Sequence, residues 1–229
     1  MFNPDNDILY EDNHLLIVNK QACQPVQADV SGDLALEDEL KAFIKIRDKK
    51  PGAVFLGVVH RIDRPVSGIV LFAKTSKALT RLNQMIKERQ IAKTYLAITE
   101  NAPTVREGKL HHFIERNPKK NKSYAYDNAR PNSKEALLEY QTIAQSTNYY
   151  LLKINLITGR HHQIRCQLSK ICTPIKGDLK YGAARSNKDG SISLHAYSVE
   201  FIHPVSKKPI YLTAPLPKDN LWNFFNDKI

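Results

Sequence analysis

The chain alternates short apolar runs of strand length with turns and contains few stretches of helical periodicity. Residues 8–10 and 15–18 are predicted as two strands around a polar turn at 11–13, and residues 68–74 form a continuous apolar run typical of a buried strand. Further strands are predicted at residues 94–98, 136–143, 149–157, 194–202 and 209–212. Consecutive strands joined by short turns favour an α+β fold with a largely antiparallel sheet over a doubly wound fold.

Helical spacing is found in a few segments between the strands. Apolar residues recur at this spacing from 36 to 44, in a helix predicted to end near Arg47 with Ser31 or Asp33 able to cap its start. A second helix is predicted after the apolar run, and a third covers residues 161–171. Because we find no repeat, low-complexity tract or flexible linker, we expect residues 1–229 to form one domain.

The charge of the chain points to a polyanionic partner. Lys and Arg number 34 against 23 Asp and Glu, a formal net charge of +11 with histidine neutral. Nucleic acid fits this charge because cations that neutralise phosphates release counterions, although a lysine-rich solubilising surface is the alternative. With neither a secretion signal nor an apolar stretch long enough to span a bilayer, we expect a soluble, cytoplasmic protein without membrane partners.

A basic stretch at residues 115–134 has almost no aliphatic side chains, which predicts a loop or ribbon. Its cations are interleaved with Tyr124 and Tyr126 and include Lys119, Lys120 and Lys122. Such a pattern suits RNA, where cations meet phosphates and aromatic rings stack on splayed bases. The alternative interpretation is a solvated excursion between two strands.

The densest polar cluster lies at residues 58–68, directly before the apolar run, and reads VVHRIDRPVSG. It places Asp63 between two arginines and a histidine, an arrangement that favours the ionised carboxylate. An ionised aspartate can serve as a nucleophile or a base. An ion-pair network that braces a turn is the alternative.

A second polar cluster, TGRHHQIR at residues 158–165, leads from a turn into the third predicted helix. Exposed amides at a helix start favour anions, so this segment, with Arg160 and Arg165 on different faces, can bind phosphate. Ordinary helix-start chemistry is the alternative.

Metal and nucleotide cofactors are not expected. The eight histidines include adjacent pairs whose side chains project to different sides, and the chain has neither CxxC nor HExxH. Its nine glycines form no GxGxxG or GxxxxGK[ST] loop. We therefore expect no metal ligands and no cofactor.

Taken with motifs elsewhere in the chain, residues 60–68 resemble the HRLDxxTSG signature of the RluA-type pseudouridine synthases. Further motifs of this family follow in order along nearly the whole chain. They are YED to NK at 10–20, KTYLA at 93–97, GRHHQIR at 159–165, GDLKYG at 177–182, and LHA at 194–196 through HP at 203–204. Several ordered motifs are far more specific than one.

The resemblance implies a pseudouridine synthase fold, with a mixed, mainly antiparallel sheet, flanking helices and a central RNA-binding cleft. It also implies the conversion of uridine to pseudouridine in ribosomal or transfer RNA, without cofactor or metal. Asp63 then matches the catalytic aspartate, which either adds to the substrate as a nucleophile or removes a ribose proton to give a glycal. The sequence leaves both routes open.

Other residues receive roles from the same resemblance. Arg165 matches the basic residue that pairs with the catalytic aspartate, and Tyr95 matches the active-site tyrosine, whose ring can pack on uracil and whose hydroxyl can move a proton. Arg61 is the candidate that fills the space left by a flipped base. His60 and Arg64 are expected to shape the cleft or contact phosphate.

The chain also departs from the family pattern. Residues 21–23 read QAC where the family commonly has PxG, which predicts the loss of a rigid turn, and Val66 replaces a threonine. Seven residues precede Ile8, so we expect a single catalytic domain over 1–229 without an appended N-terminal RNA-binding domain. A monomer is the expected state.

Two other functional hypotheses compete with pseudouridine synthesis. A catalytically inactive RNA-binding or RNA-folding protein fits the basic charge and the altered turn at 21–23, although the presence of Asp63, Tyr95 and Arg165 argues against it. The other, metal-dependent RNA hydrolysis, would need a cluster of metal ligands, and the sequence shows no such cluster.

Overall fold

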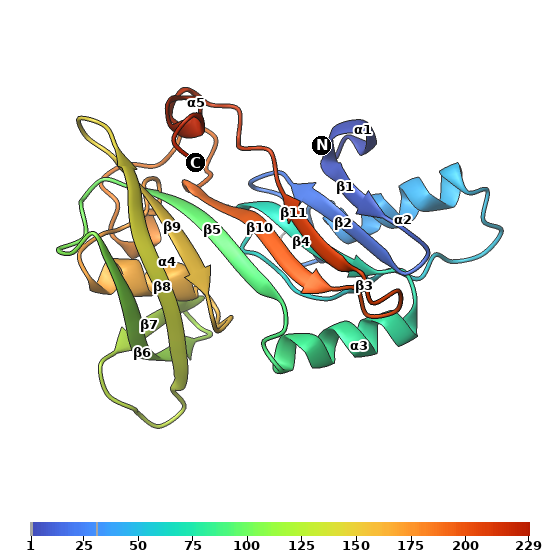
Figure 1. The fold of residues 1–229 in the computed structure, drawn as a ribbon, viewed down its shortest axis with the longest axis horizontal. Helices are drawn as coiled ribbons and strands as arrows, with labels where there is room; N and C mark the ends of the chain where they lie inside the picture. The colour runs from blue at the N-terminus through green and yellow to red at the C-terminus, as the bar shows by residue number, and fades with distance from the viewer. Residues whose placement is uncertain (1, 31) are drawn as a thin grey trace. The chain divides into compact units, whose positions relative to one another are not determined.

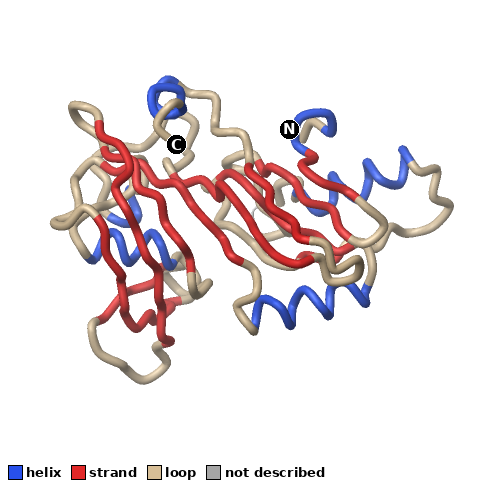
Figure 2. The backbone as a smooth tube through the Cα atoms, in the orientation of Figure 1, coloured by secondary structure: helices blue, strands red, loops and turns tan. Residues whose placement is uncertain are grey.

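Strands dominate the computed structural model, which describes residues 2–30 and 32–229 (Figure 1). Figure 2 shows the helices set between and beside these strands. The chain divides into two compact units. The first unit contains residues 1–91 and 196–215, and the second contains residues 92–195 and 216–229.

The first unit is built on a sheet with the strand order β1-β2-β4-β10, in which β3 also pairs with β4 and β11 with β10. The pairs β1–β2, β2–β4, β3–β4 and β10–β11 are antiparallel. The β1–β2 hairpin turns at Asp12, whose Oδ1 accepts the backbone N–H groups of His14 and Leu15, both at 2.7 Å. The elements are α1 (Pro4–Asp7), β1 (Ile8–Glu11), β2 (Leu15–Lys20), α2 (Leu36–Arg47), β3 (Gly57–Val58), β4 (Ser67–Ala73), α3 (Ser76–Lys87), β10 (Leu194–Ile202) and β11 (Pro209–Thr213). The first two residues of β10 fall within the bounds of the second unit.

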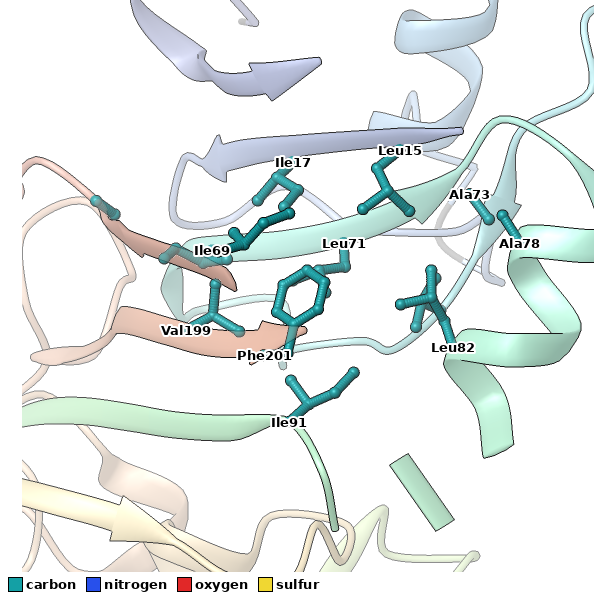
Figure 3. Packing of buried hydrophobic residues seen from close by; sticks show 13 residues of the cluster. Leu15, Ile17, Ile69, Leu71, Ala73, Ala78, Leu82, Ile91, Val199 and Phe201 are labelled. Carbon is teal, nitrogen blue, oxygen red and sulfur yellow. The ribbon is translucent and has the colours of Figure 1, made fainter. Parts of the chain in front are cut away.

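The core of the first unit lies between this sheet and α3 (Figure 3). Alternate residues of β2 and β4 point into it, and Ala78 and Leu82 of α3 cover them. The helix starts at a cap, because the Thr75 hydroxyl accepts the Ala78 N–H at 3.2 Å. Every residue of β4 is buried, so the strand that follows the polar cluster at 58–68 is fixed in position.

The second unit contains an antiparallel sheet with the order β5-β9-β8-β6-β7. The helix α4 lies against β6 and β7, and its residues 163–168 are all buried. The elements are β5 (Ala92–Thr99), β6 (Glu107–Asn117), β7 (Lys122–Tyr126), β8 (Lys134–Gln145), β9 (Tyr150–Leu156), α4 (Gln163–Lys170), the 3₁₀ turn η1 (Leu179–Tyr181) and α5 (Asn220–Asn226).

The predicted α+β fold with a mainly antiparallel sheet is confirmed. The basic stretch at 115–134 is a ribbon over its first part, where β6 and β7 form a hairpin. The first predicted helix was placed too early, since α2 begins at Leu36 after Ala35, and Asp33 instead pairs with Arg64. Ser31, the other predicted cap, lies outside the described residues. The assignment of residues 1–229 to one catalytic domain stays a prediction.

In the described part of the chain, no helix is long and apolar enough to cross a membrane.

Candidate active site

Asp63 lies on a short turn in the first unit, between β3 and β4. The turn is closed by a hydrogen bond of 3.0 Å from the Val66 N–H to the Asp63 carbonyl oxygen. The side chains on either side of the carboxylate, Ile62 and Val66, are buried at 8% and 2% exposure, while Asp63 itself is half-buried. Apolar anchors therefore hold this carboxylate at a defined place.

Lys20, at the end of β2, is tied to the same turn. Its ammonium group donates hydrogen bonds to the carbonyl oxygens of Gln21 at 2.9 Å, Gln24 at 2.8 Å and Arg64 at 3.2 Å. The side chain is 1% exposed, and burial lowers the pKa of Lys20 to about 7, while the nearby charges of Cys23 and Asp63 act in the opposite direction. A buried cation thus sits close to the candidate carboxylate.

Residues 21–23 form a turn, although their sequence, QAC in place of PxG, predicted its loss. The backbone of Cys23 adopts the left-handed conformation, with φ 67°, and its N–H donates to the Arg64 carbonyl oxygen at 2.8 Å. Cysteine therefore takes up, at some cost in backbone energy, a conformation that glycine adopts easily. The prediction of a lost turn was wrong, since this hydrogen bond and the left-handed Cys23 form the turn without proline or glycine.

Three further predicted site residues flank Asp63. The imidazole Nε2 of His60 accepts the Leu71 N–H at 3.3 Å, which joins it to β4. The Arg64 guanidinium forms an ion pair with Asp33 and donates from Nε to the Cys23 carbonyl oxygen at 3.1 Å. Arg61 is exposed. His60 and Arg64 therefore shape the turn, and the exposed guanidinium of Arg61 faces solvent.

Gly68, the last residue of the signature, is required by the packing of β4. Its φ is 111°, and a Cβ atom here would lie 2.3 Å from the carbonyl oxygen of Ala196. Since β4 and β10 are neighbours in the sheet, a side chain at this position would push them apart.

Arg165 lies in the second unit, on the buried face of α4, and is held by Asp178. The Arg165 Nε atom donates to Asp178 Oδ2 at 2.6 Å, and Nη2 donates to Oδ1 at 2.9 Å. Both side chains are buried, with exposed fractions of 6% and 1%. This is a two-point ion pair of defined geometry.

Tyr181 packs against the same guanidinium and is itself held by hydrogen bonds. Its ring centroid lies 5.0 Å from Arg165 Cζ, and Lys122 Nζ lies 5.1 Å from this centroid. The phenol oxygen accepts the Ser123 N–H at 2.8 Å and lies 2.9 Å from His162 Nδ1. Residues of β7, α4 and η1 therefore meet around this ring.

His162 precedes α4 in a left-handed conformation, with φ 52°. Burial lowers the pKa of His162 to about 2, helped by the nearby charge of Arg165, and burial raises the pKa of Tyr181. The imidazole is therefore neutral and the phenol protonated at physiological pH, so the phenol O–H can donate to Nδ1. The His161 ring stacks on that of His162 at 3.8 Å.

The remaining predicted residues of the second unit differ in exposure. Tyr95 is buried on β5, whereas Arg160 is exposed and donates from Nε to the Glu135 carbonyl oxygen at 2.8 Å. Lys119 and Lys120 are exposed at the tip of the β6–β7 hairpin. Arg160 and Arg165 were predicted to lie on different faces, and this is confirmed, since Arg165 is buried and Arg160 is exposed.

Each unit thus gathers part of the predicted set. His60, Arg61, Asp63 and Arg64 share one turn region of the first unit, and the others belong to the second. Lys20, Asp178 and Tyr181 were not predicted as site residues. Their signal in the sequence is their place in the NK and GDLKYG motifs.

The fold and these motifs together indicate the class of protein to which the chain belongs. Human RNA pseudouridylate synthase domain containing 4 superposes with a TM-score of 0.77 at 24% identity, over 93% of this chain and 89% of that one. The fold is therefore that of a pseudouridylate synthase. A family model described as RNA pseudouridylate synthase matches residues 14–170, and the chain belongs to this family.

Bacterial relatives support the same assignment. Ribosomal large subunit pseudouridine synthase C of Buchnera aphidicola subsp. Baizongia pistaciae is 33% identical over 93% of this chain and 67% of its own length. Ribosomal large subunit pseudouridine synthase D of Xanthomonas campestris pv. campestris is 32% identical, over 93% and 66%. The chain thus spans about two thirds of the length of these relatives. The resemblance to RluA-type synthases is confirmed.

Proposed function

We propose that this chain is an RNA pseudouridine synthase in which Asp63 is the catalytic carboxylate. The observation that carries the proposal is the setting of Asp63 within the HRIDRPVSG signature, half-buried on a turn that Ile62 and Val66 anchor. A carboxylate fixed in this way loses little entropy when it meets a substrate atom.

In the proposed reaction the bond between uracil N1 and ribose C1′ breaks, the uracil rotates, and a bond forms between C5 and C1′. C5 loses its proton and N1 takes up a proton, so the product is an isomer of the substrate. Asp63 either attacks the substrate as a nucleophile or removes a ribose proton to give a glycal. Neither route calls on a cofactor or a metal. By the same resemblance, Arg165 provides the cation that pairs with the carboxylate, and Tyr95 provides the ring that packs on uracil.

The substrate we propose is ribosomal RNA, because both relatives named above are called ribosomal large subunit synthases. The net charge of +11 suits a polyanion of this kind. A uridine inside a helix must be extruded before a carboxylate can reach it, and the exposed Arg61 guanidinium is the group we assign to the vacated space.

The proposal is tested by tritium release from cellular RNA labelled at uracil C5, taken from cells that lack this protein. The intact protein is expected to release tritium, and Asp63→Asn is expected to release none while binding RNA with similar affinity. Equal release by both proteins would remove Asp63 from the reaction. RNA binding without release by either protein would favour an RNA-binding role, and sequencing of the modified RNA would separate ribosomal from transfer RNA targets.

A further inference from the structure

Residues 177–182 form a short segment that touches the Arg165 guanidinium on two sides. The Asp178 carboxylate binds one edge of the guanidinium through Nε and Nη2, at 2.6 and 2.9 Å. The Tyr181 ring lies near its carbon, with 5.0 Å between Arg165 Cζ and the ring centroid. The edge contact fixes the plane of the guanidinium, and the ring restricts its tilt.

The backbone explains how one segment provides both contacts. Residues three apart on a 3₁₀ turn project to the same side, and Asp178 and Tyr181 are spaced in this way across η1. Gly177 and Gly182 bracket the turn with φ values of 88° and 102°, which glycine adopts without strain. A Cβ at Gly177 would also lie 2.8 Å from Cγ of Asn187. The GDLKYG motif therefore places the carboxylate of Asp178 and the ring of Tyr181 on the same side of the turn.

Tyr181 is itself fixed from two directions. Its phenol accepts the Ser123 N–H from β7 and can donate to the neutral His162 imidazole at the start of α4. His162 is three residues from Arg165 in sequence and holds a left-handed conformation. A non-glycine residue keeps such a conformation only where surrounding contacts hold it there. The hydrogen bond between His162 and Tyr181 is one such contact.

A long arginine side chain would otherwise sample many rotamers, and a buried cation would lack a counterion. Because Asp178 compensates the charge of Arg165, Arg165 acts on a substrate or a second carboxylate chiefly through the direction of its N–H groups. Small displacements of such donors are costly, since misplacement by about 1 Å can slow a reaction about a hundredfold.

We propose that Asp178 and Tyr181 are positioning residues that fix the Arg165 guanidinium for the pseudouridine synthase reaction. This inference rests on the proposed function, since that function gives Arg165 its role. Asp178 and Tyr181 act through Arg165 and need not touch the RNA.

The first test compares single-turnover rates and RNA affinity for Asp178→Asn. This variant keeps the size of the side chain but loses the charge and one acceptor oxygen. The rate is expected to fall about tenfold to a hundredfold, with the dissociation constant for RNA changed less than about twofold. The matched control is Asp12→Asn, which removes a carboxylate 2.9 Å from the buried His203 in the first unit and is expected to leave the rate unchanged.

A double-mutant cycle separates positioning from a general loss of structure. In an Arg165→Lys background the two-point pair is already gone, so adding Asp178→Asn should slow the reaction no further. Equal fractional losses in both backgrounds would overturn the proposal, because Asp178 would then act independently of Arg165.

The tyrosine provides a test that does not depend on the buried ion pair. Tyr181→Phe keeps the ring on the guanidinium, whereas Tyr181→Leu removes it, so the leucine variant is expected to be at least about fivefold slower than the phenylalanine variant. Equal rates would contradict a role for the ring. If Arg165→Lys slows tritium release while Asp178→Asn and Tyr181→Leu do not, the positioning role fails and the proposed function stands. If Asp63→Asn still releases tritium, the proposed catalytic role of Asp63 is wrong, whatever the Asp178 and Tyr181 variants do.

Discussion

The Nζ atom of Lys20 donates a hydrogen bond of 3.2 Å to the carbonyl oxygen of Arg64, the residue that follows Asp63. The Cys23 N–H donates to the same oxygen at 2.8 Å. Two donors therefore fix the peptide next to the proposed catalytic carboxylate. The turn depends on a lysine that is buried away from water.

The burial of Lys20 predicts a pH dependence of stability. Its pKa is lowered to about 7 in the folded protein from 10.5, chiefly by burial. Between these values the unfolded chain binds the proton more tightly, so the free energy of unfolding should rise with pH, by at most about 1.4 kcal/mol per pH unit from this group. Below pH 7 both states hold the proton, and the contribution to the slope disappears.

This dependence is measured as the difference in unfolding free energy between the intact protein and Lys20→Met, by urea denaturation at pH 7.5, 8.5 and 9.5. The difference should shift in favour of the intact protein as the pH rises. Lys119→Met, which removes an exposed lysine, is the control. A difference that stays constant over this range would show that burial does not depress the Lys20 pKa.

Gly68 is expected to tolerate no side chain. A Cβ atom 2.3 Å from the Ala196 carbonyl oxygen, at a φ of 111°, combines a steric clash with backbone strain. Gly68→Ala should lower the free energy of unfolding by about 3 kcal/mol or more. The control is Gly52→Ala, where nothing lies within 4 Å of the added atom. Thermal unfolding of the two variants measures the effect, and equal stability would mean that β4 and β10 can separate at no cost.

His203 of the HP motif lies beside Asp12 of the YED motif. Its Nδ1 accepts the N–H groups of Val205 and Ser206 at 3.0 and 2.9 Å, and its Nε2 lies 2.9 Å from Asp12 Oδ2. His203→Ala would leave the two N–H groups without this acceptor. Because both belong to exposed residues, each lost hydrogen bond should lower the free energy of unfolding by about 0.5–1.5 kcal/mol. His203→Asn places an oxygen near the position of Nδ1 and should recover part of the loss. Chemical denaturation compares the two, and equal losses would show that the acceptor is unimportant.

Local signals explain which parts of the fold could be predicted. The β1–β2 hairpin follows from apolar runs around Asp12, which caps its own turn, and β4 follows from one continuous apolar run. The start of α2 could not be located in this way. Asp33 is a good cap by type, but it pairs with Arg64, a residue distant in sequence.

In the candidate site, too, residues within motifs could be predicted, whereas contacts between residues distant in sequence could not. Asp63, Arg165 and Tyr95 were found through motifs that carry chemistry. Lys20 is an unusual fully buried lysine, and only the folded chain brings three carbonyl oxygens to its ammonium group. The link between Asp178 and Arg165 depends on how η1 folds back on α4, which residue spacing alone does not give.

The β6–β7 hairpin leads to a prediction about RNA affinity. Lys119 and Lys120 are exposed at its tip, whereas Lys122 is half-buried with its ammonium over the Tyr181 ring. The two tip lysines are therefore the ones available to phosphates. Lys119→Gln with Lys120→Gln should weaken binding at low salt and reduce the slope of log affinity against log salt by about 1.4 to 1.8, at about 0.7 to 0.9 per phosphate contact.

The rate at saturating RNA should not change, because the exposed side chains of Lys119 and Lys120 are expected to contact phosphates and have no proposed role in the chemistry. The matched control is Lys49→Gln with Lys50→Gln, which removes two exposed lysines that follow α2 in the first unit. Filter binding across a salt series measures both double variants. Equal changes in slope would mean that net charge alone governs binding, whereas a larger change for the hairpin variant would place phosphate contacts at the tip of the hairpin.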